Sequence, residues 1–209
     1  MAAVPYGLMR AFLFDIDGTL VDSSASIEHV WRQVAFEFGV DAAAVLAACH
    51  GRRDADVVDD FFEPELREAA VTRVNVLDTE SVDQVVPTAG ARQLLANLDE
   101  GRWAAVTSGP RPLMAARLRA AGLPVPRVLI TADDVEFGKP HPEGYLMAAA
   151  ALGVAPARCV VVEDSPAGVA AGKAAGALVV AVTTTHPAEL LGGADFVVND
   201  LTELPLAMP

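Results

Sequence analysis

Apolar residues are arranged in two different ways along this chain, and the arrangement changes near residue 88. From residue 88 onward, short continuous apolar runs alternate with segments in which apolar residues recur every three or four positions. Continuous runs are typical of strands buried on both faces, and the wider spacing is typical of amphipathic helices. The alternation predicts an α/β fold, with a Rossmann-like parallel sheet and helices on both of its faces.

The individual elements can be placed from these runs and from the Gly and Pro residues that separate them. Strands are expected at residues 8–14, 103–106, 127–130, 159–162, 178–182 and 196–198. Helices are expected at residues 89–98, 112–121, 143–152, 166–175 and 187–191.

Between the first strand and residue 88 the chain has helical spacing throughout. Val30, Trp31 and Val34 belong to an apolar series spaced by three and four residues, and Gly39 ends the helix that this series predicts. Further helices are expected at residues 41–49, 54–62 and 64–77. We therefore predict an inserted α-helical cap domain of residues 22–87, within a core formed by residues 1–21 and 88–209.

Composition narrows the class of protein. The chain has 209 residues, of which 53% are hydrophobic, and a formal net charge of −13. This charge disfavours nucleic acid or an anionic membrane as the main partner. Only two cysteines are present, far apart, and no apolar run is long enough to span a bilayer. We expect a cytoplasmic protein with reduced thiols, whose oligomeric state the sequence does not determine.

Polar residues with related chemistry follow several of the predicted strands. Asp15 and Asp17 follow the first strand, and Thr107, Ser108 and Gly109 follow the second. Lys139 lies in the loop after the third strand, and Glu163 and Asp164 follow the fourth. Ligands of open parallel sheets bind beyond the carboxyl ends of the strands. Each residue alone also has a structural interpretation, such as an Asp-Gly turn or a helix N-cap, but together they predict one site.

The chemistry of this set points to phosphoryl transfer. The carboxylates of Asp15, Asp17, Glu163 and Asp164 are oxygen donors that suit Mg²⁺. Lys139 would add positive charge, while Thr107 and the amides near Ser108 and Gly109 would donate hydrogen bonds to a phosphoryl group. Asp15 is the expected nucleophile. Asp17 is the expected general acid and base.

Four motifs in order give the chain a clear resemblance to a known family. They are DIDGTLVDS at residues 15–23, VTSG at 106–109, GKPHPEGY at 138–145 and VVEDSPAGVAAGKAAG at 161–176. The chain resembles the haloacid dehalogenase superfamily, in its sugar- and polyol-phosphate phosphatase branch with a helical cap.

The resemblance implies a role for each matched residue. Asp15 is phosphorylated, Asp17 is the acid and base, Thr107 holds the phosphoryl group, and Lys139 contacts the nucleophile. Mg²⁺ is held by Asp15, Asp164, the main-chain carbonyl of Asp17 and Glu163. Dehalogenases of the superfamily typically carry an aromatic residue where this chain has Asp17, so dehalogenation is not expected.

The cap is expected to select the substrate, a small phosphorylated metabolite. His50, Arg52 and Arg53 lie at a break between two predicted cap helices and are candidates for contacting it. A β-phosphoglucomutase-like activity is the alternative. Such mutases typically place an arginine three residues after the cap glycine, where this chain has Asp54, whose charge would repel a second phosphate.

A non-catalytic α/β binding module is a further alternative. The segment from Gly168 to Lys173 is similar to a phosphate-binding loop, but it is one residue short between its glycines and no Ser or Thr follows the lysine. It also falls inside a predicted helix. Asp15 and Asp17, which such a module would be expected to have lost, are both present.

Overall fold

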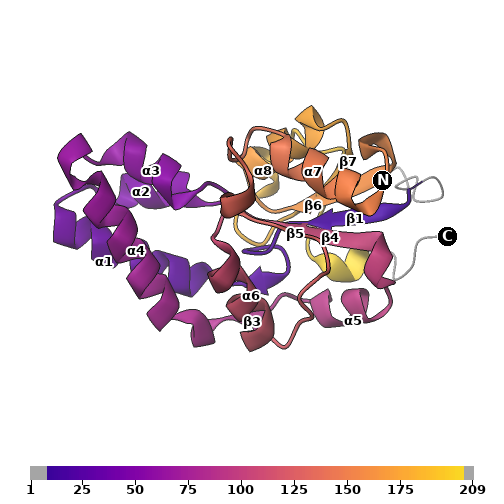
Figure 1. Cartoon of the computed structure of the whole chain (residues 1–209), viewed down its shortest axis with the longest axis horizontal. Helices are drawn as coiled ribbons and strands as arrows, with labels where there is room; N and C mark the ends of the chain where they lie inside the picture. The colour runs from indigo at the N-terminus through magenta and orange to yellow at the C-terminus, as the bar shows by residue number, and fades with distance from the viewer. Residues whose placement is uncertain (1–8, 205–209) are drawn as a thin grey trace.

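The computed structural model describes residues 9–204 and shows a parallel sheet with a helical bundle at one end (Figure 1). Six strands form the sheet in the order β5-β4-β1-β6-β7-β8. Their bounds are β1 Ala11–Phe14, β4 Trp103–Val106, β5 Leu129–Ile130, β6 Cys159–Glu163, β7 Leu178–Val182 and β8 Phe196–Val198. The predicted fold class, an α/β fold with a parallel sheet and an inserted helical segment, is confirmed.

Both faces of the sheet are covered by helices, which explains why its strands are apolar throughout. Phe12 and Phe14 of β1 pack into one core cluster, together with residues of α5 (Ala91–Ala96) and α6 (Arg111–Ala120). Ala11 and Leu13 point the other way, into a second cluster with α7 (Glu143–Leu152) and α8 (Pro166–Ala174). Figure 1 shows these two helix pairs on opposite sides of the sheet.

The segment after β1 forms a helical bundle of four helices with its own core. They are α1 Ser24–Phe38, α2 Ala42–Cys49, α3 Asp54–Phe61 and α4 Arg67–Glu80. Val30, Trp31 and Val34 of α1 pack with Val57 and Val74 in a third apolar cluster. The helical spacing thus predicted the packing face of α1, and Gly39 ends that helix in a left-handed conformation as expected.

A short two-stranded ribbon joins the bundle to the sheet, and the sequence did not predict it. β2 (Val21–Asp22) pairs antiparallel with β3 (Val86–Pro87), so the two connections of the bundle lie side by side. Strands of two residues are too short for a periodic signal, and their pairing joins segments far apart in sequence. The proposed division at residues 22 and 87 falls in this ribbon and stays a prediction.

Several predicted elements differ from the observed ones at their ends. The strand expected at residues 127–130 is only Leu129–Ile130, since β5 lies at the sheet edge and pairs with β4 alone. Pro64–Leu66 and Ala188–Leu190 form 3₁₀ turns where helices were expected, and α5 is shorter than residues 89–98. Leu8, expected to begin the first strand, lies outside the described residues. No helix within residues 9–204 has the length and apolar character needed to cross a membrane.

Candidate active site

The carboxyl ends of β1, β4 and β6 meet at the edge of the sheet that faces the helical bundle. β1 lies between β4 and β6, so residues that follow these strands are neighbours although they are distant in sequence. Asp15 follows β1, Thr107 follows β4, and β6 ends at Glu163 with Asp164 directly after it. A cavity of about 50 Å³, lined by core and bundle residues, lies at this edge. The sheet order therefore assembles the site.

The turn after β1 depends on Gly18. Its φ of 84° lies in the left-handed region that favours glycine, and a Cβ there would come within 2.2 Å of Oδ2 of Asp164. The next residue, Thr19, is fully buried and donates its hydroxyl to Oδ1 of Asp164 over 3.1 Å. The Asp-Gly-Thr sequence therefore holds the turn after β1 against the end of β6.

Lys139 is a buried cation between two carboxylates. Its Nζ lies 2.5 Å from Oδ1 of Asp15 and 2.6 Å from Oε1 of Glu163, and it also donates to the carbonyl of Val106 over 3.3 Å. Burial lowers the pKa of Lys139, but the charges of Asp15 and Glu163 outweigh that effect and hold its pKa above the usual value. Lys139 is therefore charged at neutral pH and fixed beside Asp15.

Glu163 is fully buried and surrounded by hydrogen-bond donors. Its Oε1 accepts from Lys139 and from the hydroxyl of Tyr145, at 2.6 and 2.7 Å. Its Oε2 accepts from the backbone N–H groups of Asp164 and Ser165 and from the Ser165 hydroxyl. These contacts support Lys139 and the loop after β6. The predicted role of Glu163 as a direct metal ligand stays a prediction.

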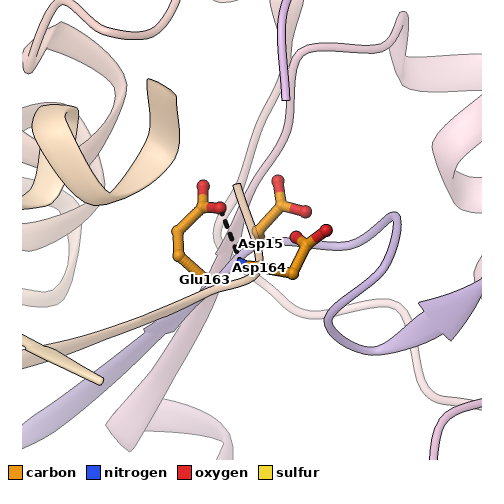
Figure 2. A group of neighbouring side chains, drawn as sticks. All are labelled: Asp15, Glu163 and Asp164. Atoms are coloured by element: carbon orange, nitrogen blue, oxygen red, sulfur yellow. Dashed lines mark hydrogen bonds between the residues drawn. The ribbon is translucent and has the colours of Figure 1, made fainter. Parts of the chain in front are cut away.

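Asp15, Glu163 and Asp164 form a buried group of carboxylates that fits a metal ion. One oxygen from each lies within 4.8 Å of the others, and Figure 2 shows the three side chains around the end of β6. Burial raises the pKa of Asp15 well above its usual value, against the attraction of Lys139. Burial, with the charge of Glu163, raises the pKa of Asp164 to about 7. A divalent cation would relieve this repulsion, and oxygen donors suit Mg²⁺.

The side chain of Asp17 does not belong to this group of carboxylates and has other partners. Its Oδ1 accepts hydrogen bonds from the Ser23 hydroxyl at 2.7 Å and from a terminal nitrogen of Arg117 at 2.9 Å. The other terminal nitrogen of Arg117 binds Asp78 of α4 at 2.6 Å. Asp17 is therefore held at the cavity by a core arginine that also contacts the helical bundle.

Thr107, Ser108 and Gly109 line the same cavity as Asp15 and Asp17. The Thr107 hydroxyl accepts from the backbone N–H of Gly109 over 3.2 Å, which shapes the turn after β4. The Ser108 hydroxyl donates to the carbonyl of Gly51 in the helical bundle, over 2.8 Å. This turn therefore lines the cavity together with Asp15 and also contacts the bundle.

The candidate substrate residues of the bundle lie in different places. His50 and Arg52 line the cavity, whereas Arg53 lines neighbouring grooves. The Arg53 guanidinium binds both carboxylate oxygens of Asp56 at 2.8 Å and the carbonyl of Glu136 at 3.0 Å. Arg52 pairs with Asp60 at 2.7 Å. Both guanidiniums are thus bound within or near α3, and their contact with substrate stays a prediction.

Sequence reasoning gave no role to Arg117, Asp78 or Tyr145. Arg117 and Asp78 lie on helices with no surrounding motif, and only the packing of α6 against the helical bundle brings them to Asp17. Tyr145 does stand in the quoted motif GKPHPEGY. The sequence signal for Tyr145 is its place in that motif, six residues after Lys139, and no role was inferred from it.

Comparison with known proteins agrees with this geometry. A family model for haloacid dehalogenase-like hydrolases matches residues 9–176. The chain belongs to this family. The resemblance inferred from the four motifs is therefore confirmed, and so is the class of enzyme, a phosphatase-type hydrolase.

Similar proteins with assigned activities include two phosphatases. Hexitol phosphatase A of Escherichia coli is 40% identical over 200 residues, which cover 93% of each chain. 2-Deoxyglucose-6-phosphate phosphatase 1 of Saccharomyces cerevisiae is 36% identical over 220 residues, covering 92% of this chain and 88% of the yeast enzyme. A β-phosphoglucomutase from Clostridium difficile has a similar structure, with a TM-score of 0.83, 23% identity, and coverage of 94% and 93%. That last likeness shows the fold alone.

Proposed function

We propose that this protein is a Mg²⁺-dependent phosphatase that hydrolyses a small sugar or polyol phosphomonoester through an aspartyl-phosphate on Asp15. The observation that carries the proposal is the buried contact of 2.5 Å between Lys139 and Asp15, beside a group of carboxylates suited to a metal. The names of the similar phosphatases, which refer to a hexitol and a deoxysugar phosphate, support the substrate class.

In the first step, a carboxylate oxygen of Asp15 forms a bond to phosphorus while the bond from phosphorus to the ester oxygen breaks. Attack by one anion on another requires nearby positive charge, which Lys139 supplies. Thr107 and the backbone N–H groups of the turn after β4 would donate hydrogen bonds to the phosphoryl oxygens, and the Thr107 hydroxyl would leave the Met114 sulfur to which it donates here. Asp15 is then phosphorylated and the leaving group is an alcohol.

Asp17 carries the proton in both steps. It gives a proton to the departing ester oxygen, and it later accepts one from the water that attacks the phosphoaspartate. The second attack breaks the bond between phosphorus and Asp15, which releases phosphate and restores the carboxylate. The hydrogen bonds from Ser23 and Arg117 fix the position of Asp17 during this exchange.

A metal ion at this site would be held by Asp15 and Asp164, with Glu163 and the main-chain carbonyl of Asp17 as the further predicted ligands. Bound Mg²⁺ would supply additional positive charge for the phosphoryl oxygens. The three buried carboxylates Asp15, Glu163 and Asp164 share only the charge of Lys139 among the contacts described, which supports a requirement for a cation.

The helical bundle would act as a cap that closes over the substrate. The cavity of about 50 Å³ has room for a water molecule or two, so a sugar phosphate can enter only when the bundle moves. Contacts such as Ser108 with Gly51 and Arg53 with the Glu136 carbonyl join the two parts. Closure would exclude water from the site, which strengthens its electrostatic interactions.

Mutase activity is the second candidate, and Asp54 argues against it. A mutase must hold a second phosphate across the cavity, and Asp54 lines that cavity in the place where the resemblance expects an arginine. The structural likeness to a β-phosphoglucomutase concerns the fold and does not bear on this point.

The proposal can be tested by release of phosphate from p-nitrophenyl phosphate. We expect turnover with Mg²⁺, loss of turnover with a chelator, and a fall of at least about 10³-fold in Asp15→Asn. Asp83→Asn, a matched change at an exposed residue, should leave the rate unchanged. Normal turnover in Asp15→Asn would rule out the mechanism. The mutase would be favoured if the protein converted β-glucose 1-phosphate to glucose 6-phosphate faster than it released phosphate from it.

A further inference from the structure

Besides Arg52, three charged residues that line the cavity have no chemical step in the proposed mechanism. Arg117 comes from the core helix α6, Asp54 begins α3, and Asp78 lies in the last turn of α4. The core and the helical bundle both contribute to this cluster, which we call the leaving-group subsite. Its position beside Asp17 is where the alcohol of a phosphomonoester would lie.

Arg117 has an unused hydrogen-bond donor at this place. The residue is 3% exposed, and its two terminal nitrogens bind Asp17 and Asp78. Its Nε is buried and has no hydrogen-bond partner within residues 9–204. A buried donor left unpaired is unfavourable, so such groups in native proteins call for an explanation. This nitrogen has almost no accessible surface here, so a ligand atom could accept its hydrogen bond only after the bundle has moved.

The carboxylates of the subsite offer the complementary groups. Burial, with the charge of Asp78, raises the pKa of Asp54 to about 7, while burial raises the pKa of Asp78 to about 6 against the attraction of Arg117. A carboxyl group near its pKa can accept or donate a hydrogen bond. A hydroxyl group can do both as well. The subsite therefore matches neutral hydroxyls in its hydrogen-bonding capacity.

The cavity also has an apolar part beside these polar groups. Trp31 and Val30 of α1 face it from the bundle, and Leu113 and Met114 of α6 face it from the core. A polyol or sugar has both C–H and O–H groups, so its carbon chain can contact these side chains while its hydroxyls reach the subsite. The mixture of an aromatic residue with a few fixed polar groups is typical of small-molecule sites.

We propose that Arg117, Asp54 and Asp78 bind adjacent hydroxyl groups of an uncharged polyol or sugar leaving group and exclude substrates that carry a second anionic group. The inference rests on the proposed phosphatase function and makes its substrate class narrower. Arg117 Nε donates to one hydroxyl oxygen, and the two carboxylates accept from or donate to its neighbours.

Exclusion of a second anion follows from the charges around the cavity. Such an anion would meet Asp54 and Asp78 at close range in a buried site, where like charges are poorly screened. The positive charge of Arg117 is already shared by Asp17 and Asp78, and Arg52 is paired with Asp60. No cation of the subsite is left over to balance a carboxylate or a second phosphate.

The kinetic test compares two substrates that differ in leaving-group charge. We expect the Mg²⁺-loaded protein to have a kcat/KM for sorbitol 6-phosphate at least about 100-fold above that for 2-phosphoglycolate. Asp54→Asn should raise kcat/KM for 2-phosphoglycolate about tenfold, and Asp78→Asn should act in the same direction. Arg117→Lys keeps the charge but removes Nε, and it should raise the KM for sorbitol 6-phosphate about tenfold.

Asp83→Asn is the matched control, because it removes one exposed carboxylate outside the cavity. Its ratio of kcat/KM for sorbitol 6-phosphate to kcat/KM for 2-phosphoglycolate should equal that of the wild-type protein. The proposal would be overturned if Asp54→Asn and Asp78→Asn both kept a ratio of the two kcat/KM values within twofold of wild type. Circular dichroism would establish that both variants are folded.

A binding experiment tests the subsite without turnover. In Asp15→Asn with Mg²⁺, calorimetry should show tighter binding of sorbitol 6-phosphate than of 2-phosphoglycolate. In the double variant that also carries Asp54→Asn, the ratio of the two dissociation constants should fall about tenfold. Equal binding of the two compounds would overturn the subsite even if phosphate release were normal. Absence of phosphate release with the expected binding difference would instead contradict the proposed function and leave the subsite supported.

Discussion

Glu163 is a residue whose surroundings allow only a carboxylate. All five of its hydrogen-bond contacts come from donors, including Lys139, Tyr145 and Ser165. A neutral amide of the same shape would place its own N–H₂ group against one of these donors. The charge of Glu163 also pairs with Lys139, which is paired with Asp15 as well.

We therefore expect Glu163→Gln to destabilise the fold by about 2–4 kcal/mol and to lower phosphatase activity strongly. Tyr145→Phe is the matched comparison, because it removes a single hydrogen bond to the same oxygen and leaves Lys139 in place. It should cost about 1 kcal/mol and keep kcat within a few-fold. Urea unfolding and phosphate release measure both effects. Equal stability of Glu163→Gln and the wild type would contradict this account.

Asp54 makes stability depend on pH. Burial, with the charge of Asp78, raises its pKa from an ordinary value of 3.8 to about 7 in the folded protein. The folded state therefore binds the proton more tightly than the unfolded chain does. The contribution of Asp54 to stability is fully present below pH 4 and is lost as the pH rises through about 7.

Asp54→Asn removes this titration and should stabilise the protein more at pH 8 than at pH 5. Thermal unfolding at the two pH values gives the comparison, and Asp83→Asn serves as the control with an exposed carboxylate. A stabilisation that is equal at both pH values would show that Asp54 titrates in the folded state as it does in the unfolded chain.

At the scale of the element, helix α8 has a glycine, Gly168, in its first turn, where alanine would ordinarily make a helix more stable. Ser165 caps this helix by accepting from the N–H of Gly168 at 3.1 Å. A Cβ on Gly168 would come within 1.8 Å of the Glu163 carboxyl group. The first turn of α8 is therefore packed directly against the side chain that supports Lys139.

Gly168→Ala should lower both stability and activity, although alanine exceeds glycine in helix propensity by about 1 kcal/mol. The added methyl group would displace Glu163 and, through it, Lys139. Gly101→Ala is the control, because no atom lies within 4 Å of its added Cβ, and it should leave both properties nearly unchanged. Melting temperature and phosphate release are the measurements, and a stabilised, active Gly168→Ala would contradict the packing described here.

At the scale of the whole molecule, the site joins the sheet to the helical bundle. Arg117 of the core binds Asp17 of the core and Asp78 of the bundle, so the position of the bundle is linked to the proposed general acid. The three buried carboxylates at the strand ends concentrate negative charge in the same region. A cation bound there would stabilise the folded state as a whole.

We expect Mg²⁺ to raise the melting temperature. At a concentration 100 times its dissociation constant it should add about 2.7 kcal/mol, which corresponds to a shift of about 5–10 °C for a chain of this size. Asp164→Asn should abolish the shift, and Asp83→Asn should retain it. An unchanged melting temperature in the wild-type protein at saturating Mg²⁺ would rule out the carboxylate group as a metal site.

The sequence by itself determined the features that depend on local pattern. The apolar runs predicted the parallel sheet and its helices, and the helical spacing around Trp31 predicted the bundle. The residues after the strands, such as Asp15 and Glu163, identified the site because the carboxyl ends of parallel strands converge at one edge. These signals lie within short segments, so they can be recognised without coordinates.

Only the tertiary structure decided how helices distant in sequence meet at the cavity. It showed that Arg117 of α6 binds both Asp17 and Asp78 of α4. Such contacts depend on how α4 and α6 pack, and no local pattern encodes that packing. The strand-end motifs therefore carry the proposed reaction, while the residues proposed to choose the substrate are brought together by the fold.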